Sequence, residues 1–209
     1  MDLETYISTH CDSEPPYLAE ISRRAYVRLL NPRMTAGHVQ GRLLKMFCEM
    51  IRPQKILELG AFVGYSTLCM AEGTAENAGI HTVECDDELE DILRENFASA
   101  PFGKKIILHI GDALQVIETL KNTVFDLVFI DADKKEYIAY YQAVMPLVRK
   151  GGFIIADNTF WNGKIFEPLH QNDPRTAEIL NFNDFIAKDQ RIEKIILPLR
   201  DGLTIIRKK

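Results

Sequence analysis

The chain has 209 residues, of which 46% are hydrophobic and 26% charged, and its formal net charge is −5. These values are typical of one globular domain, and no stretch approaches the ~20 apolar residues that a membrane span requires. The negative charge argues against a dedicated nucleic-acid-binding protein. Because the N-terminus also lacks the basic start and apolar run of a secretory signal, we expect a cytoplasmic protein without a membrane partner.

The first fifty residues are predicted to form helices. Apolar residues fall on one face of a helix that ends at Pro53, namely Val39, Leu43, Met46, Phe47 and Met50. Six basic residues without an acid lie between Ile21 and Lys45: Arg23, Arg24, Arg28, Arg33, Arg42 and Lys45. We interpret them as a solvated helix face, and the alternative is a surface for the phosphates of a coenzyme A tail or RNA.

From Lys55 onwards, short apolar runs rich in β-branched residues alternate with helical stretches. The predicted strands are Lys55–Gly60, Ile80–Cys85, Lys105–Ile110, Phe125–Asp131 and Phe153–Asp157, followed by a hairpin of Glu193–Leu199 and Leu203–Arg207. A helix with Tyr137, Tyr141, Val144, Met145 and Val148 on one face is closed by Gly151 and Gly152. The pattern predicts a doubly wound, Rossmann-like α/β fold: a mostly parallel seven-stranded sheet with helices on both faces and a C-terminal antiparallel hairpin.

The first predicted strand runs into a glycine loop with the sequence ELGAFVGYST. Gly60 permits a sharp turn and close approach of a ligand, and Gly64 allows the next helix to pack tightly. Ser66 lies in the first turn of that helix, where free N–H groups favour a carboxylate. Phe62 stands where a dinucleotide motif has its middle glycine, and no phosphate-binding loop follows, which argues against a dehydrogenase.

Acidic residues follow the next two strands. Glu84 can accept hydrogen bonds from both hydroxyls of a ribose, and Asp112 can bind the exocyclic amine of an adenine. A ligand with a carboxylate, a ribose and an adenine, but without a required pyrophosphate, fits S-adenosylmethionine. The three strand ends together therefore predict this cofactor.

Further acids follow the fourth and fifth strands. Because these strand ends lie close together in a parallel sheet, Asp131, Asp157 and Asn158 are expected to converge. Three oxygen ligands suit a hard cation, Mg²⁺ first, with Mn²⁺ and Ca²⁺ as alternatives. The structural alternative is that the acids cap helices and pair with Lys134. The four cysteines show no metal-binding spacing and are expected to be buried, reduced thiols, and His38 and His109 are expected to be structural.

Four segments resemble the cation-dependent O-methyltransferases, the group of caffeoyl-CoA and catechol O-methyltransferases and their bacterial relatives. They are ELGAFVGYST, FDLVFIDADK followed by Tyr137, DNTFWNG and LPLRDGLTII, and the resemblance runs from about Met34 to the C-terminus. The catechol enzyme's aromatic residue before the base is replaced by Asp133, so the match is closer to the caffeoyl-CoA and bacterial branch.

The resemblance implies roles for individual residues. It implies Lys134 as general base beside Asp131, a metal held by Asp131, Asp157 and Asn158, and a substrate contact at Asn162. The implied cofactor contacts are Ala36, Glu58, Gly60, Ala61, Phe62, Ser66, Glu84, Asp112, Ala113, Asp131 and Asp133. We expect one domain over 1–209, with a helical substrate and dimer region at 1–52 and a cofactor-binding core at 53–209, in a homodimer.

The chemistry limits the acceptor. A metal lowers the pKa of a bound hydroxyl and fixes its position for in-line attack on the sulfonium methyl group. Two adjacent oxygens would chelate the metal, so we expect a catechol or hydroxycinnamoyl small molecule. The alternatives are a tRNA methyltransferase acting on 5-hydroxyuridine, which offers the same oxygen pair, and a non-catalytic cofactor-binding module.

Overall fold

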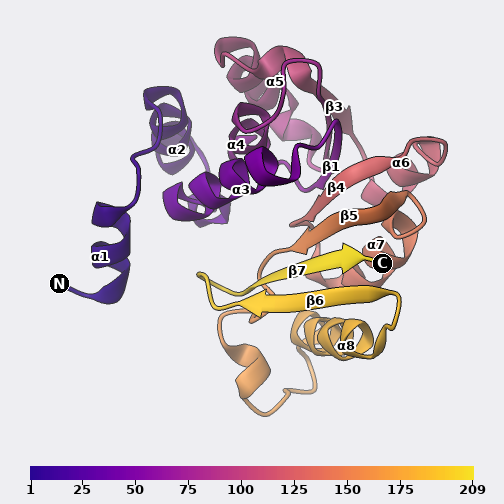
Figure 1. Ribbon diagram of the computed structural model, residues 1–209. Helices are drawn as coiled ribbons and strands as arrows, with labels where there is room; N and C mark the ends of the chain where they lie inside the picture. The colour runs from indigo at the N-terminus through magenta and orange to yellow at the C-terminus, as the bar shows by residue number, and fades with distance from the viewer.

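The computed structural model describes residues 1–209, apart from the side chain of Glu4. Its centre is one seven-stranded sheet in the order β3-β2-β1-β4-β5-β7-β6 (Figure 1). The strands are β1 Lys55–Leu59, β2 Gly79–Glu84, β3 Ile106–Ile110, β4 Phe125–Ile130, β5 Val148–Ala156, β6 Ile192–Leu197 and β7 Leu203–Lys208. β1 to β5 run parallel, and β7 lies antiparallel between β5 and β6. The predicted α/β fold with its antiparallel C-terminal hairpin is confirmed.

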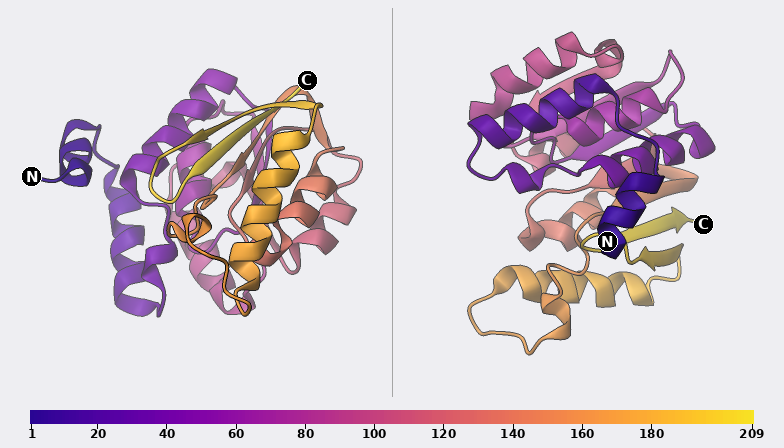
Figure 2. Two further views of the ribbon diagram at one scale, coloured as in Figure 1. Left: turned by 90° about the horizontal axis from the view of Figure 1, so that it is seen from below. Right: turned by 90° about the vertical axis from the view of Figure 1, so that its left-hand side faces the viewer.

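Helices cover both faces of the sheet. They are α1 Leu3–His10, α2 Pro16–Arg28, α3 His38–Ile51, α4 Tyr65–Glu72, α5 Glu90–Ser99, α6 Ala113–Thr119, α7 Tyr137–Val144 and α8 Pro174–Lys188, with short 3₁₀ turns η1 Pro32–Met34, η2 Asp87–Leu89, η3 Gly103–Lys105, η4 Lys134–Glu136 and η5 Lys164–Phe166. Buried side chains of α6, α7 and α8 pack together on one face, and those of α2 to α5 pack on the other. α1 projects from the body beside α3 (Figure 2). Among the described residues, no helix is long and apolar enough to cross a membrane.

The buried face of α3 differs from the predicted apolar stripe. Met46 and Met50 are 54% and 74% exposed, whereas the buried stripe consists of Gln40, Gly41, Leu44 and Cys48. The cause is close packing on α4, because a Cβ atom at Gly41 would lie 2.7 Å from the sulfur of Cys69. A small residue, Gly41, therefore occupies the contact with α4, which a count of apolar residues does not detect.

The fifth strand begins earlier than predicted. α7 ends at Val144, and Val148 pairs with Phe125 at the start of β5 instead of continuing the helix. The register then shifts before Leu127 pairs with Phe153, and Gly151 adopts a φ of +75°. The two glycines therefore belong to an irregular strand and do not close a helix.

The four cysteines are free thiols. The prediction of buried thiols is correct for Cys48 and Cys69 and wrong for Cys11 and Cys85, which are exposed. Cys11 follows the end of the peripheral helix α1, and Cys85 follows the end of β2, so neither is covered by the sheet or its helices.

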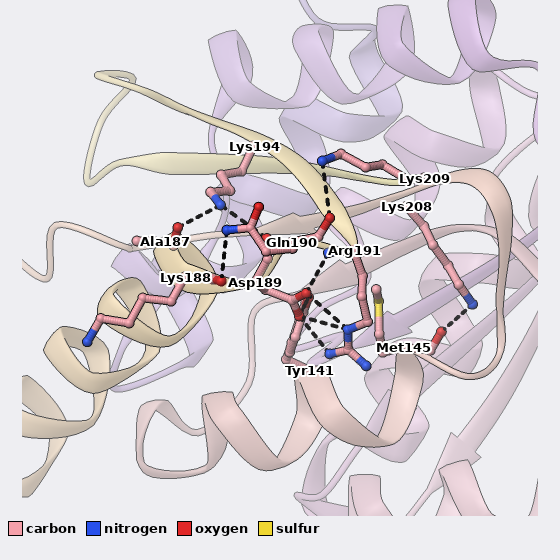
Figure 3. A network of polar contacts seen from close by, with 10 residues as sticks. All are labelled: Tyr141, Met145, Ala187, Lys188, Asp189, Gln190, Arg191, Lys194, Lys208 and Lys209. Atoms are coloured by element: carbon pink, nitrogen blue, oxygen red, sulfur yellow. Dashed lines mark hydrogen bonds and ion pairs between the residues drawn. The ribbon is translucent and has the colours of Figure 1, made fainter.

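The corner between α8 and β6 lies at the end of the sheet opposite the carboxyl end of β5. Figure 3 shows the polar contacts of this corner. The Asp189 carboxylate accepts hydrogen bonds from the Tyr141 hydroxyl at 2.9 Å and from Arg191 at 2.6 Å. Lysine ammonium groups donate to backbone carbonyls, namely Lys194 to Ala187, Lys209 to Gln190, and Lys208 to Met145 and Val148. These cations stabilise the C-terminal carbonyls of α8 and the neighbouring turns, so they have a structural role in this corner.

Candidate active site

A cavity of about 700 Å³ lies at the carboxyl ends of the parallel strands, where a doubly wound fold binds ligands. Of the implied cofactor residues, it is lined by Ala36, Gly60, Ala61, Phe62, Ser66, Glu84, Asp112, Ala113, Asp131 and Asp133. Lys134, Asp157 and Asn158 line the same cavity. Glu58 and Asn162 are outside its lining.

The glycine loop follows β1 and is held by its neighbours. The backbone N–H groups of Gly60 and Ala61 donate to the carbonyl of Val83 at 2.9 and 3.0 Å. Gly60 has a φ of +93° and lies directly against the carbonyl group of Asp131. This close approach requires a residue without a Cβ atom, so the loop sequence and the tip of β4 depend on each other.

Glu84 and Asp112 stand at the ends of β2 and β3. The Glu84 carboxylate accepts hydrogen bonds from the backbone N–H groups of Phe62 at 2.7 Å and Asp86 at 3.0 Å, which ties β2 to the glycine loop. Asp112 caps α6 by accepting from the N–H of Gln115 at 2.9 Å. Asp112 therefore caps α6 and also lines the cavity.

Glu58 lies beneath the loop and is fully buried. Its two oxygens accept hydrogen bonds from the hydroxyls of Ser66 and Thr82, both at 2.6 Å, and of Thr67. Burial raises the pKa of this carboxyl to about 7. Glu58 therefore binds the first turn of α4 from below and reaches the cavity only through Ser66.

Asp131, Lys134 and Asp157 meet at the ends of β4 and β5. The Lys134 Nζ atom lies 2.7 Å from Asp131 Oδ1 and 2.6 Å from the hydroxyl of Tyr137. The Tyr137 hydroxyl donates to the carbonyl of Asp157 at 2.9 Å, so it joins the two strand ends. Burial and the neighbouring Asp131 carboxylate raise the pKa of Asp157.

Gln40 completes this cluster and was not foreseen from the sequence. It lies on α3, is 1% exposed, and its Nε2 atom donates to Asp157 Oδ2 at 2.5 Å. A polar side chain on the buried face of a helix is a signal for such a contact, but the predicted face of α3 excluded Gln40. The N-terminal helices thereby contact the acid cluster directly.

The segment after β5 has an unusual backbone. Asn158, Trp161 and Asn162 all have a positive φ, between 48° and 54°, which few non-glycine residues adopt. Asn162 is exposed, and its N–H donates to Asp201 at 2.5 Å, so this predicted substrate contact anchors the loop to the turn before β7. Trp161, which was not predicted, lines the cavity.

The acid cluster has the donor chemistry of a hard divalent cation. Asp131 and Asp157 are adjacent carboxylates whose mutual repulsion a cation would relieve, and Asn158 adds an amide oxygen. Among the described residues, no group of three or more histidines, cysteines and acids is arranged to hold a metal. Because the two carboxylates and the amide of the acid cluster offer only oxygen ligands, this set fits Mg²⁺ better than a softer metal.

The basic segment between Ile21 and Lys45 is mostly neutralised by neighbouring acids. Arg23 and Arg24 pair with Glu20 and Glu95, Arg42 with Glu72, and Lys45 with Glu49, at 2.6 to 2.9 Å for the shortest contact of each cation. Arg33 is different, because it lines the cavity. The pairing favours the interpretation as a solvated helix face and gives no support to an RNA-binding surface.

A Rossmann-like sheet with a glycine loop and acids at four successive strand ends is typical of proteins that bind a nucleoside-containing cofactor. A model of the family described as O-methyltransferase matches residues 7–209. The chain therefore belongs to the O-methyltransferase family, within the group of caffeoyl-CoA and catechol O-methyltransferases, and is an S-adenosylmethionine-dependent enzyme. The predicted family and the predicted cofactor S-adenosylmethionine are confirmed.

Individual relatives agree with this assignment. The chain is 33% identical to a caffeoyl-CoA O-methyltransferase of Petroselinum crispum, over 84% of this chain and 77% of that protein. It is 34% identical to the catechol O-methyltransferase domain-containing protein 1 of Mus musculus, over 79% of this chain and 64% of that protein. The crystal structure of an O-methyltransferase from Bacillus cereus in complex with SAH has a TM-score of 0.91 at 27% identity, covering 99% of this chain and 97% of that chain.

Proposed function

We propose that this enzyme methylates one of two adjacent hydroxyl groups on a small aromatic acceptor, with a divalent cation held by Asp131, Asp157 and Asn158. The observation that carries the proposal is the contact of Lys134 with the Asp131 carboxylate at 2.7 Å, within the cavity of the cofactor loop. Caffeoyl-CoA and catechol, the compounds named in the relatives, both carry adjacent hydroxyls on an aromatic ring. This common feature supports the same acceptor class here.

The strand ends divide the cavity between the parts of the cofactor. In this proposal, Glu84 accepts hydrogen bonds from the ribose hydroxyls and Asp112 accepts one from the adenine amine. The N-terminus of α4, with Ser66 in its first turn, suits the carboxylate of the methionine moiety. Glu58 supports this turn by accepting the hydrogen bond of Ser66.

Bound at the acid cluster, the cation would supply Lewis acidity that lowers the pKa of the acceptor hydroxyl. Lys134 takes the hydroxyl proton on its Nζ atom, which Asp131 and Tyr137 hold in place. Asp131 would be one of the residues that hold the cation, and its carboxylate also contacts Lys134. The resulting oxygen nucleophile is aligned with the methyl group by the walls of the cavity.

The test is a methyl-transfer assay with catechol, caffeoyl-CoA and undermodified tRNA, each with and without EDTA. We expect activity on the catechol-type acceptors, its loss in EDTA, and a decrease of about 100-fold or more in Asp157→Asn. Asp184→Asn, an exposed aspartate of α8, is the matched control. Full activity in EDTA, or activity on tRNA alone, would contradict the proposal.

A further inference from the structure

Three arginines line the active-site cavity and have no role in the proposed methyl transfer. Arg33 lies on η1, Arg175 in the first turn of α8, and Arg200 in the turn between β6 and β7. All three are exposed at the protein surface while contributing to the cavity wall. Three chain segments far apart in the sequence therefore place positive charge around one opening.

The strand order locates Arg200 relative to the cofactor. Glu84 and Asp112 stand at β2 and β3, on one side of the acid cluster, whereas β7 lies beyond β5 on the other side. The turn before β7 holds the loop after β5, because Asp201 and Gly202 accept backbone hydrogen bonds from residues 159–162. Arg200 therefore lies on the side of the acid cluster away from the adenine and ribose positions.

The conformation of Arg200 is held by specific contacts. Its φ is +48°, a value that few non-glycine residues adopt. Both terminal nitrogens of the guanidinium approach the carbonyl of Thr35 at 3.4 Å, and the side chain packs over Gly37. A guanidinium has five N–H donors, so this long contact to one carbonyl leaves donors free. The turn thus holds the Arg200 guanidinium at the cavity wall, although the positive φ of Arg200 is unfavourable for a non-glycine residue.

The charges of these arginines are only partly balanced. Among the described residues, Arg33 and Arg200 have no salt bridge, and Arg175 lies 3.6 Å from Asp133. The carboxylate of the cofactor is accounted for at the N-terminus of α4, next to β1 and distant in sheet order from the β7 turn. The unpaired positive charge is therefore available to a group of the acceptor.

We infer that the acceptor carries an anionic group, a carboxylate or a phosphate, which Arg200 binds together with Arg33 and Arg175. This inference rests on the proposed function, since it assumes that the same molecule presents its hydroxyls to the acid cluster. Guanidinium groups form strong, paired hydrogen bonds with carboxylates and phosphates. The arginines thus select charged acceptors over neutral catechols of the same shape.

The single tryptophan of the chain provides the measurement. Trp161 lines the cavity, so its fluorescence reports acceptor binding without any methyl transfer. The holoenzyme, with Mg²⁺ and S-adenosylhomocysteine, is titrated with 3,4-dihydroxybenzoate, its neutral methyl ester and 3,4-dihydroxyphenylphosphonate. We expect at least one charged ligand to bind about tenfold or more tightly than the ester, and the tighter of the two identifies the group.

The variants assign the discrimination to the arginines. Arg200→Gln is expected to bring the affinity ratio of charged to neutral ligand close to one, and Arg33→Gln to lower it in part. Arg200→Gly serves if the glutamine variant does not fold, because glycine adopts the positive φ without strain. Arg23→Gln, which removes an exposed arginine of α2 that pairs with Glu20 outside the cavity, should retain the ratio.

Methyl transfer from S-adenosylmethionine is measured in parallel with the same ligands. Equal affinities of acid, phosphonate and ester, a ratio that Arg200→Gln and Arg200→Gly leave unchanged, or binding of none of the ligands would overturn the anion site. If the charged ligand binds more tightly but no ligand is methylated, the proposed function fails and the anion site stands. If all ligands are methylated and all bind with equal affinity, the anion site fails and the proposed function stands.

Discussion

Gly60 joins the cofactor loop to the acid cluster, so replacing it with alanine is a sharp test of the site. A Cβ atom at this position would lie 2.8 Å from the carbonyl carbon of Asp131 and closer still to its oxygen. The tip of β4 would have to move by roughly 1 Å to relieve this overlap. The φ of +93° adds strain, because a side chain disfavours this conformation.

The structure sets the size of the effect. Backbone strain of about 1–2 kcal/mol and overpacking of about 1–3 kcal/mol together destabilise Gly60→Ala by about 2–5 kcal/mol. For a chain of this length, we expect the melting temperature to fall by about 5–15 °C. Displacement of Asp131 by roughly 1 Å should also lower kcat by about 100-fold.

Gly79→Ala is the matched control. Gly79 begins β2, and a Cβ atom there would have no neighbour within 4 Å. We expect the free energy of unfolding of this variant to lie within about 1 kcal/mol of the wild-type value, and its activity to be retained. Calorimetry and the methyl-transfer assay measure both effects. Equal melting temperatures and equal kcat for the two variants would refute the packing argument.

Two further predictions concern buried polar groups. Gln40→Leu removes the side-chain N–H donor to Asp157 Oδ2, so the affinity for Mn²⁺, measured by electron paramagnetic resonance, should fall by about 10- to 100-fold. Unchanged affinity would show that this contact does not orient the Asp157 carboxylate. Glu58 has its pKa raised from 4.5 to about 7, so the folded state binds this proton more tightly than the unfolded state, and stability declines as the pH rises from 4.5 towards 7. Glu58→Gln should remove up to roughly 3 kcal/mol of this pH dependence in urea unfolding, and parallel curves for variant and wild type would contradict the assignment.

The arrangement of strands and helices could be predicted because it depends on local patterns. Each parallel strand is a short apolar run that ends at or next to a glycine or an acid, and parallel strands bring those ends to one edge of the sheet. The convergence of Gly60, Asp131 and Asp157 on one cavity follows from this rule. The irregular start of β5 did not follow, since Gly151 and Gly152 are equally compatible with the end of a helix.

The roles of similar residues depended on tertiary contacts. Glu58 and Glu84 both stand near a strand end, but Glu58 is enclosed by three hydroxyl groups beneath the loop and Glu84 lies at the cavity. Gln40 contacts Asp157 across 117 residues of sequence, and Arg200 contacts Thr35 across 165. Such pairs have no local pattern that predicts them.

The sequence by itself determined the class of fold, the cofactor and the strand ends that form the site, because these depend on hydrophobic periodicity and on residue types at fixed places along the chain. The tertiary structure decided which face of α3 is buried, which acids are enclosed, and which cations face the cavity. These properties arise from packing between distant segments, where a close contact such as Gly41 against Cys69 overrides the local preference for apolar burial.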